Sequence, residues 1–352
     1  MQSCFDRVSY PNQQLLMQAL QYLGQLSSSA IELISPKYPA DPVPDLTLGC
    51  GFFDSPPSEV GLVPRGNYSI NYEIHGLGQE KICLVMGFMA SMASWKQIVA
   101  AYPKDRYSLL VMDNRGLGFS SNGSIERYST SAMADDLIAL LDHIKWTASR
   151  SVNLVGCSMG GMIAMEAAFK IPSRLKSLLL LATCASHVNP PRSYYEHSVY
   201  WFNFLRPKPD PIVRVDALCN DLYSQLWLDS HDDRYPSFPT NRDRMHATFL
   251  RRWKESPPVK LATVFGQGGA CATHFVSRER LEFIGENIPD SLCLTGTEDS
   301  LIYHACSDTL AAGLNCPVVK LEGRGHGLPF ESEREVVESI NQLIESSTFR
   351  YG

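Results

Sequence analysis

The residues best suited to chemistry in this chain begin with a serine between small residues. Gly156-Cys157-Ser158-Met159-Gly160 fits the pattern G-x-S-x-G; an apolar run, residues 152–155, precedes it and a helix-like segment follows. Glycines around a serine permit a tight strand-to-helix turn that exposes its hydroxyl, and the helix N-terminus directs N–H groups at it. Five-residue matches also arise by chance, and the alternative is a serine that only caps the helix. The strand before and the small residues after favour Ser158 as a nucleophile.

A serine hydroxyl needs a base to attack, and the base needs a group that orients it. The chain has nine histidines. His326 lies in the glycine-rich segment EGRGHGLPFE, between the last expected strand and the last expected helix. Loops that follow parallel strands meet at the carboxyl edge of the sheet, where the serine turn also lies. His326 is therefore the candidate base, and surface or core roles are expected for the other eight histidines.

The acid is expected in the loop after the preceding strand, Thr295-Gly296-Thr297-Glu298-Asp299-Ser300. Asp299 gives the chain order Ser158, Asp299, His326, which suits a serine triad on a parallel sheet. Glu298 is the rival acid, and Asp299 has an alternative role as N-cap of a helix starting at Leu301. The loop after residues 175–187 offers no carboxylate, which favours Asp299.

Attack on an acyl group creates an oxyanion that two backbone N–H groups must stabilise. The first expected donor is the N–H of Met159, directly after the serine. The second is the N–H of Phe88 in Met86-Gly87-Phe88-Met89, where Gly87 would give the backbone freedom to aim it. Met86, Gly87 and Met89 are also candidate substrate contacts. The alternative is an ordinary strand-to-helix loop without a role in chemistry.

Alternating strands and helices must bring these groups together. From about residue 61, apolar strand-like runs alternate with helical segments of 10 to 15 residues, which predicts an α/β fold. We expect a mostly parallel, doubly wound sheet with helices on both faces, formed by residues 61–186 and 287–352. Residues 187–286 interrupt the pattern and predict a mostly helical cap insertion. Residues 1–60, helical and then Pro-rich, predict an N-terminal extension.

Composition excludes several classes of function. Hydrophobic residues make up 44% and charged residues 19%, and the net charge of −6 offers no basic surface for nucleic acid. We find no apolar run long enough for a transmembrane segment and no signal peptide, so a cytoplasmic location is expected. The ten cysteines are scattered, so neither a disulfide framework nor a metal site is predicted. No cofactor is expected.

On these motifs the sequence resembles the α/β-hydrolase fold superfamily, among its esterase-like and lipase-like serine hydrolases. Residues 113–120, DNRGLGFS, resemble that family's D-x-R-G-x-G-x-S loop, and GCSMGG resembles its nucleophile elbow. The likeness extends over residues 61–186 and 287–347. It implies the α/β-hydrolase fold with a cap and a Ser158–His326–Asp299 triad. One departure is Met86-Gly87, where the family usually has His-Gly. The serine separates this chain from dehalogenases and epoxide hydrolases of the same fold, which use aspartate.

The first functional hypothesis is hydrolysis of an ester-type bond, in a carboxylic ester or a lactone, by a carboxylesterase-like serine hydrolase. Methionines and aromatic residues near the serine and in the cap indicate a small, largely apolar substrate. Acyl transfer to an alcohol or thiol, and carbon–carbon bond hydrolysis, use the same triad and stay open. A third class is a ligand-binding member of the fold without catalysis. The sequence does not indicate the oligomeric state.

Overall fold

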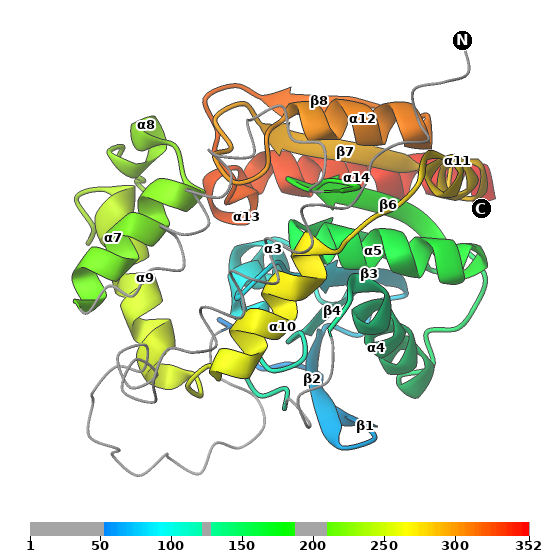
Figure 1. Ribbon diagram of the computed structural model, residues 1–352, viewed down its shortest axis with the longest axis horizontal. Helices are drawn as coiled ribbons and strands as arrows, with labels where there is room; N and C mark the ends of the chain where they lie inside the picture. Colours follow the sequence, from blue (N-terminus) through cyan, green and yellow to red (C-terminus); the bar gives the residue numbers. More distant parts are fainter. Residues whose placement is uncertain (1–52, 122–127, 187–209, 352) are drawn as a thin grey trace, which may run out of the picture.

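The structure, a computed structural model, describes residues 53–121, 128–186 and 210–351. Its centre is an eight-stranded sheet with the strand order β1-β2-β4-β3-β5-β6-β7-β8 (Figure 1). The strands are β1 (Glu59–Arg65), β2 (Tyr68–His75), β3 (Glu80–Val85), β4 (Tyr107–Met112), β5 (Val152–Cys157), β6 (Leu175–Leu181), β7 (Ser291–Gly296) and β8 (Val318–Leu321). Strand β2 runs antiparallel to β1 and β4, and the pairs from β4 to β8 are parallel. The predicted fold class is confirmed.

The parallel register aligns the carboxyl ends of the central strands. Every residue of β5 and β6 is buried, as expected for parallel strands covered on both faces. Val85 of β3 pairs with Gly156 of β5, and Leu181 of β6 pairs with both Cys157 and Leu294. The loops after β3, β5, β6 and β7 therefore leave the sheet at one edge.

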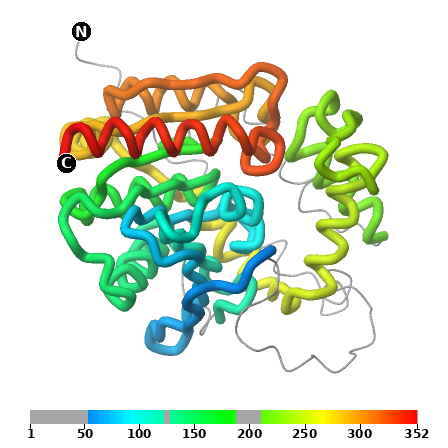
Figure 2. The backbone as a smooth tube through the Cα atoms, turned by 180° about the vertical axis from the view of Figure 1, so that it is seen from behind, coloured from blue at the N-terminus to red at the C-terminus, as the bar shows by residue number. Residues whose placement is uncertain are grey.

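Helices cover both faces of the sheet. One face carries α4, α5, α11 and α12, and the other carries η1, α3, α13 and α14, of which α14 is the red helix in Figure 2. The helices of the core are η1 (Met92–Trp95), α3 (Lys96–Ala100), α4 (Thr130–His143), α5 (Met159–Lys170), η2 (Pro172–Arg174), α11 (Arg278–Asn287), α12 (Ala305–Leu314), α13 (Leu328–Glu331) and α14 (Glu333–Tyr351). Although α11 lies almost wholly inside the range expected for the insertion, it packs against α5 and α12.

Between β6 and α11 the chain leaves the sheet and forms α7 (Pro211–Leu222), α8 (Gln225–Leu228), α9 (Asn241–Glu255) and α10 (Leu261–Ala272). Helices α7, α8 and α9 stand to one side of the sheet in both views (Figures 1 and 2). They share a separate apolar cluster that includes Val215, Trp227 and Met245. Residues 187–209, the first part of the expected cap, lie outside the described residues.

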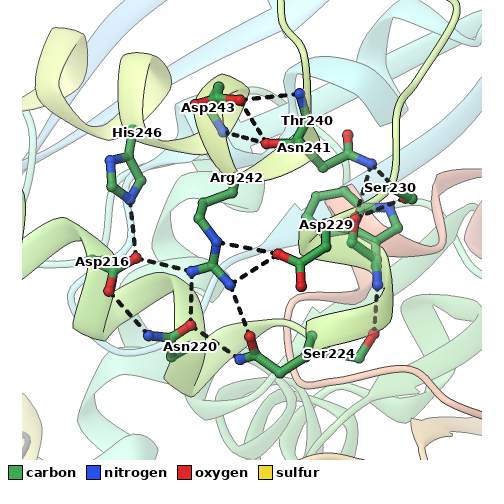
Figure 3. A network of polar contacts seen from close by, with 12 residues as sticks. Asp216, Asn220, Ser224, Asp229, Ser230, Thr240, Asn241, Arg242, Asp243 and His246 are labelled. Atoms are coloured by element: carbon green, nitrogen blue, oxygen red, sulfur yellow. Dashed lines mark hydrogen bonds and ion pairs between the residues drawn. The ribbon is translucent and has the colours of Figure 1, made fainter.

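A polar network holds α7, α8 and α9 together (Figure 3). The Arg242 guanidinium of α9 donates to Asp216 and Asn220 of α7 at 2.9 and 2.8 Å, and to Gln225 of α8 at 2.8 Å. One side chain therefore connects three helices. Because these groups are partly exposed, each ion pair adds little stability by itself.

Most of the expected N-terminal extension, residues 1–52, also lies outside the described residues. The first strand begins at Glu59, inside the range 1–60 that was expected for the extension. In the part of the chain that the structure describes, none of the helices has the length and apolar character that crossing a membrane requires.

Candidate active site

Ser158 occupies a strained turn between β5 and α5. Its backbone has φ 57° and ψ −124°, a conformation that costs a non-glycine residue about 1–3 kcal/mol. Two bonds hold it there, because its N–H donates to Leu181 O at 2.9 Å and its carbonyl accepts from Thr183 Oγ1 at 2.7 Å. A Cβ on Gly160 would lie only 2.1 Å from Val85 O. The turn therefore needs glycine after the serine so that α5 can start against the end of β3.

The loop after β3 lies directly against Ser158. A Cβ added to Gly87 would stand 2.8 Å from Ser158 Cβ and 3.3 Å from Ser158 Oγ. Gly87 is not among the glycines with positive φ, whereas Met89 has φ 56°. Close approach, and not the conformational freedom we expected, is thus the reason for glycine here. Asn114 Nδ2 holds the loop from below by donating to Met86 O at 2.7 Å.

His326 and Asp299 form a buried pair on the loops after β8 and β7. His326 Nδ1 lies 2.7 Å from Asp299 Oδ2, and the two side chains are 6% and 0% exposed. The second carboxylate oxygen, Asp299 Oδ1, accepts from the N–H groups of Leu301 and Ile302 at 2.8 Å each. That turn delays the next helix, which begins at Ala305 and not at Leu301 as expected. Glu298, the rival acid, is exposed.

A second carboxylate positions the histidine loop. Glu331 Oε2 accepts from Gly325 N–H at 2.8 Å, and its Oε1 accepts from Ser224 Oγ and, at 3.3 Å, from Ser224 N–H. Burial raises the pKa of Glu331 above its usual value. Gly327 N–H donates to Leu222 O at 2.7 Å. The histidine loop therefore packs against the end of α7 and the residues directly after it, which sequence reasoning missed.

The Asp113 loop supports the site without entering it. Asp113 Oδ1 accepts from Met92 N–H at 2.9 Å, and its Oδ2 accepts from Phe119 N–H at 3.1 Å and Asn71 Nδ2 at 3.2 Å. Burial raises the pKa of Asp113 to about 6. A Cβ on Gly118 would collide with this carboxylate at 2.1 Å. In the D-x-R-G-x-G-x-S motif, the aspartate therefore accepts hydrogen bonds from backbone N–H groups, and the second glycine leaves room for its carboxylate.

Two further histidines, His246 and His274, have surroundings that differ from those of His326. His246 Nε2 faces Asp216 at 3.4 Å in the polar network of α7, α8 and α9, where Asp216 also accepts from Arg242 (Figure 3). His274 Nδ1 pairs with Thr130 Oγ1 at 2.8 Å, and burial lowers the pKa of His274 to about 3. These contacts match the surface and core roles expected for them.

Of the three expected triad residues, His326 and Asp299 are in direct contact. The hydrogen bonds among the described residues include His326 with Asp299, but none between Ser158 and His326. Catalytic hydrogen bonds often become short and well aligned only in the complex with substrate. Burial raises the pKa of the Cys157 thiol to about 12, so the neighbouring cysteine stays protonated. Within the described ranges, no group of His, Cys, Asp and Glu side chains is arranged to hold a metal ion.

Several known hydrolases are similar to this chain. RutD of Variovorax paradoxus, provisionally assigned as a carbamate hydrolase, is 26% identical over 70% of this chain and 84% of its own length. The 3-oxoadipate enol-lactonase 2 of Acinetobacter baylyi is 28% identical over 33% of this chain and 42% of its own. A thermophilic esterase from Thermogutta terrifontis superposes with a TM-score of 0.64 at 22% identity, covering 82% of this chain and 99% of the esterase.

The sequence profile of the alpha/beta hydrolase fold matches residues 80–332, from the first parallel strand to the end of the histidine loop and its supporting carboxylate. That stretch contains the serine turn, the Gly87 loop and the His326–Asp299 pair. The chain belongs to the alpha/beta hydrolase fold family.

Proposed function

We propose that the protein is a serine hydrolase that cleaves ester-type bonds, in a carboxylic ester or a lactone, of a small and largely apolar substrate. The observation that carries the proposal is the buried His326–Asp299 pair with its 2.7 Å contact, at the sheet edge where β5 also ends in the strained turn at Ser158. A histidine beside a buried carboxylate, at the same edge as an accessible serine, is the arrangement that nucleophilic acyl chemistry requires.

His326 acts as the base through Nε2. Because its Nδ1 faces the Asp299 carboxylate, Nδ1 carries the proton and Nε2 is left as the acceptor. Ser158 Oγ attacks the acyl carbon while Nε2 takes its proton, and the imidazolium then protonates the leaving alcohol as the C–O bond breaks. Water repeats the sequence on the acyl-enzyme and releases the acid. Asp299 stabilises the imidazolium in both halves.

Two backbone N–H groups receive the oxyanion in this proposal. Met159 is the first residue of α5, so its N–H has no acceptor within the helix. Phe88 follows Gly87, whose backbone lies against Ser158. We assign the second donor to the N–H of Phe88. The adjacent Met89 N–H is bonded to Gln267 Oε1 at 3.0 Å.

The substrate class follows from the surroundings of the serine and from the relatives. Met86, Gly87 and Met89 would contact the acyl group, and none of the three carries a charged group that could bind a substrate. The named activities of the relatives, on carbamates, enol-lactones and esters, all concern acyl groups bound to oxygen or nitrogen. An uncharged ester or lactone fits both.

The test is a panel of p-nitrophenyl esters of increasing acyl length, together with lactones, run on the wild type and on Ser158→Ala. We expect turnover of several panel members that falls by at least about 10³-fold in the variant, with an unchanged circular dichroism spectrum. Equal turnover by both proteins would remove Ser158 from the mechanism. Absence of turnover and of serine labelling in the folded wild type would favour a binding protein instead.

A further inference from the structure

A buried glutamine on α10 connects two loops of the core. Gln267 is 0% exposed. Its Oε1 accepts from Met89 N–H at 3.0 Å, and its Nε2 donates to Arg115 O at 3.2 Å. Because both polar ends of the amide are bonded to backbone groups on different loops, the side chain fixes the separation of those loops.

Helix α10 is a firm support for this side chain. Thr263 Oγ1 donates to Gly116 O at 3.2 Å near its start. In its middle, a Cβ on Gly266 would stand 2.6 Å from the Tyr128 ring, so the helix backbone touches the core directly. Unlike α7, α8 and α9, which share their own cluster, α10 is attached to the core along its length.

The group that Gln267 holds is next to the proposed oxyanion donor. Met89 has φ 56°, a backbone conformation that residues other than glycine seldom adopt. Its N–H donates to the buried Oε1 of Gln267. At the other end of the loop, Asn114 Nδ2 donates to Met86 O at 2.7 Å. The two amides therefore hold both ends of residues 86–89 and leave little room for Phe88 N–H to change direction.

We propose that Gln267 is a positioning residue for the oxyanion hole, through which α10 sets the direction of the Phe88 N–H. The proposal rests on the proposed serine hydrolase function. It makes α10 part of the catalytic apparatus and separates it from the rest of the cap. Gln267 does not touch the reacting atoms, so its loss should act on the rate of the chemical step and not on the capture of the substrate.

The experiment compares Gln267→Met with Thr263→Val. Methionine keeps the unbranched shape of glutamine but accepts hydrogen bonds only weakly. Valine removes the bond that Thr263 Oγ1 donates to Gly116 O, nearer the start of α10. For Gln267→Met we expect kcat about 10- to 100-fold lower, since misplaced catalytic groups cost of that order, with KM within about threefold. For Thr263→Val both constants should stay near those of the wild type.

A trifluoromethyl ketone inhibitor provides the readout that a structural role would not change. Its adduct with Ser158 places an oxyanion in the hole, so Gln267→Met should weaken its binding by about the same factor as kcat, and Thr263→Val should not. Wild-type kcat and inhibitor affinity in folded Gln267→Met would overturn the proposal. If the wild type itself shows no Ser158-dependent turnover, the proposed function fails first.

Should Gln267→Met fail to fold, hydrogen exchange on the wild type decides. A Met89 amide bonded to a fully buried side chain should exchange only through opening of α10 or of the loop. We expect slow exchange at Met89. Exchange there at the rate of an exposed loop amide would overturn the proposal without any variant.

Discussion

Gly87→Ala tests how closely the loop after β3 approaches Ser158. The new Cβ would stand 2.8 Å from Ser158 Cβ, and 3.4 Å is the lower end of ordinary contact. The loop or the serine must therefore move by about 0.6 Å. Backbone strain does not enter, because Gly87 is not in a positive-φ conformation that alanine avoids. The effect of the methyl group comes from contact alone.

The displacement falls on the proposed nucleophile and the proposed oxyanion donor at once. Because a misplacement of about 1 Å can cost about 100-fold in rate, we expect kcat to fall about 10- to 100-fold. The free energy of unfolding should fall less than in a core substitution, because the loop can yield. Stopped-flow or steady-state hydrolysis of the best p-nitrophenyl ester measures kcat, and urea denaturation measures the stability.

Gly269→Ala is the matched control. Gly269 lies in α10, and a Cβ there meets nothing within 4 Å. The control should keep wild-type kcat and gain up to about 1 kcal/mol of stability from the better helix former. If Gly87→Ala keeps wild-type kcat as well, the loop does not close on Ser158, and Phe88 loses its role as oxyanion donor.

Three further outcomes are expected. Asp299→Asn should lower kcat at least about 10³-fold because the imidazolium loses its counter-charge. Glu298→Gln should change kcat less than about threefold. The reverse order of the two effects in steady-state assays would move the acid to Glu298. Burial raises the pKa of Asp113 to about 6 from an ordinary 3.8. Between these two pH values the folded protein binds more protons than the unfolded chain. The free energy of unfolding that this group contributes therefore falls as the pH rises. Urea titrations should show the wild type losing about 3 kcal/mol relative to Asp113→Asn over that window, and a constant difference would argue against it. Ser158→Gly should have a free energy of unfolding about 1 kcal/mol above that of Ser158→Ala, since φ 57° strains only the alanine; equal values in calorimetry would mean that the turn stores no strain.

The sheet could be predicted from the sequence because strand and helix periodicities alternate over most of the core. The same pattern placed Ser158, Asp299 and His326 on loops at one edge, since parallel strands send their carboxyl ends there. The structure adds the 2.7 Å contact of His326 with Asp299. Local sequence determined these loops, and tertiary contacts set their geometry.

The supporting residues could not be predicted because their partners are remote. Gln267 lies 178 residues from Met89, and Glu331 lies 107 residues from Ser224. No local spacing signals such pairs. The role of Gly87 was misread for a related reason, since absence of a side chain and freedom of φ look the same in a sequence. Helix α12 begins later than expected because the Asp299 carboxylate accepts from the N–H groups of Leu301 and Ile302, which precede the helix.

The most direct test of the account is covalent labelling of the folded protein with a fluorophosphonate, read by intact mass and peptide mapping. A serine activated by His326 should take up one phosphonyl group, on the peptide that contains Ser158. Ser158→Ala should remain unlabelled, and His326→Ala should be labelled far more slowly. A wild type that stays unlabelled at Ser158, or a Ser158→Ala variant labelled at the wild-type rate, would contradict the central claim that Ser158 is the nucleophile.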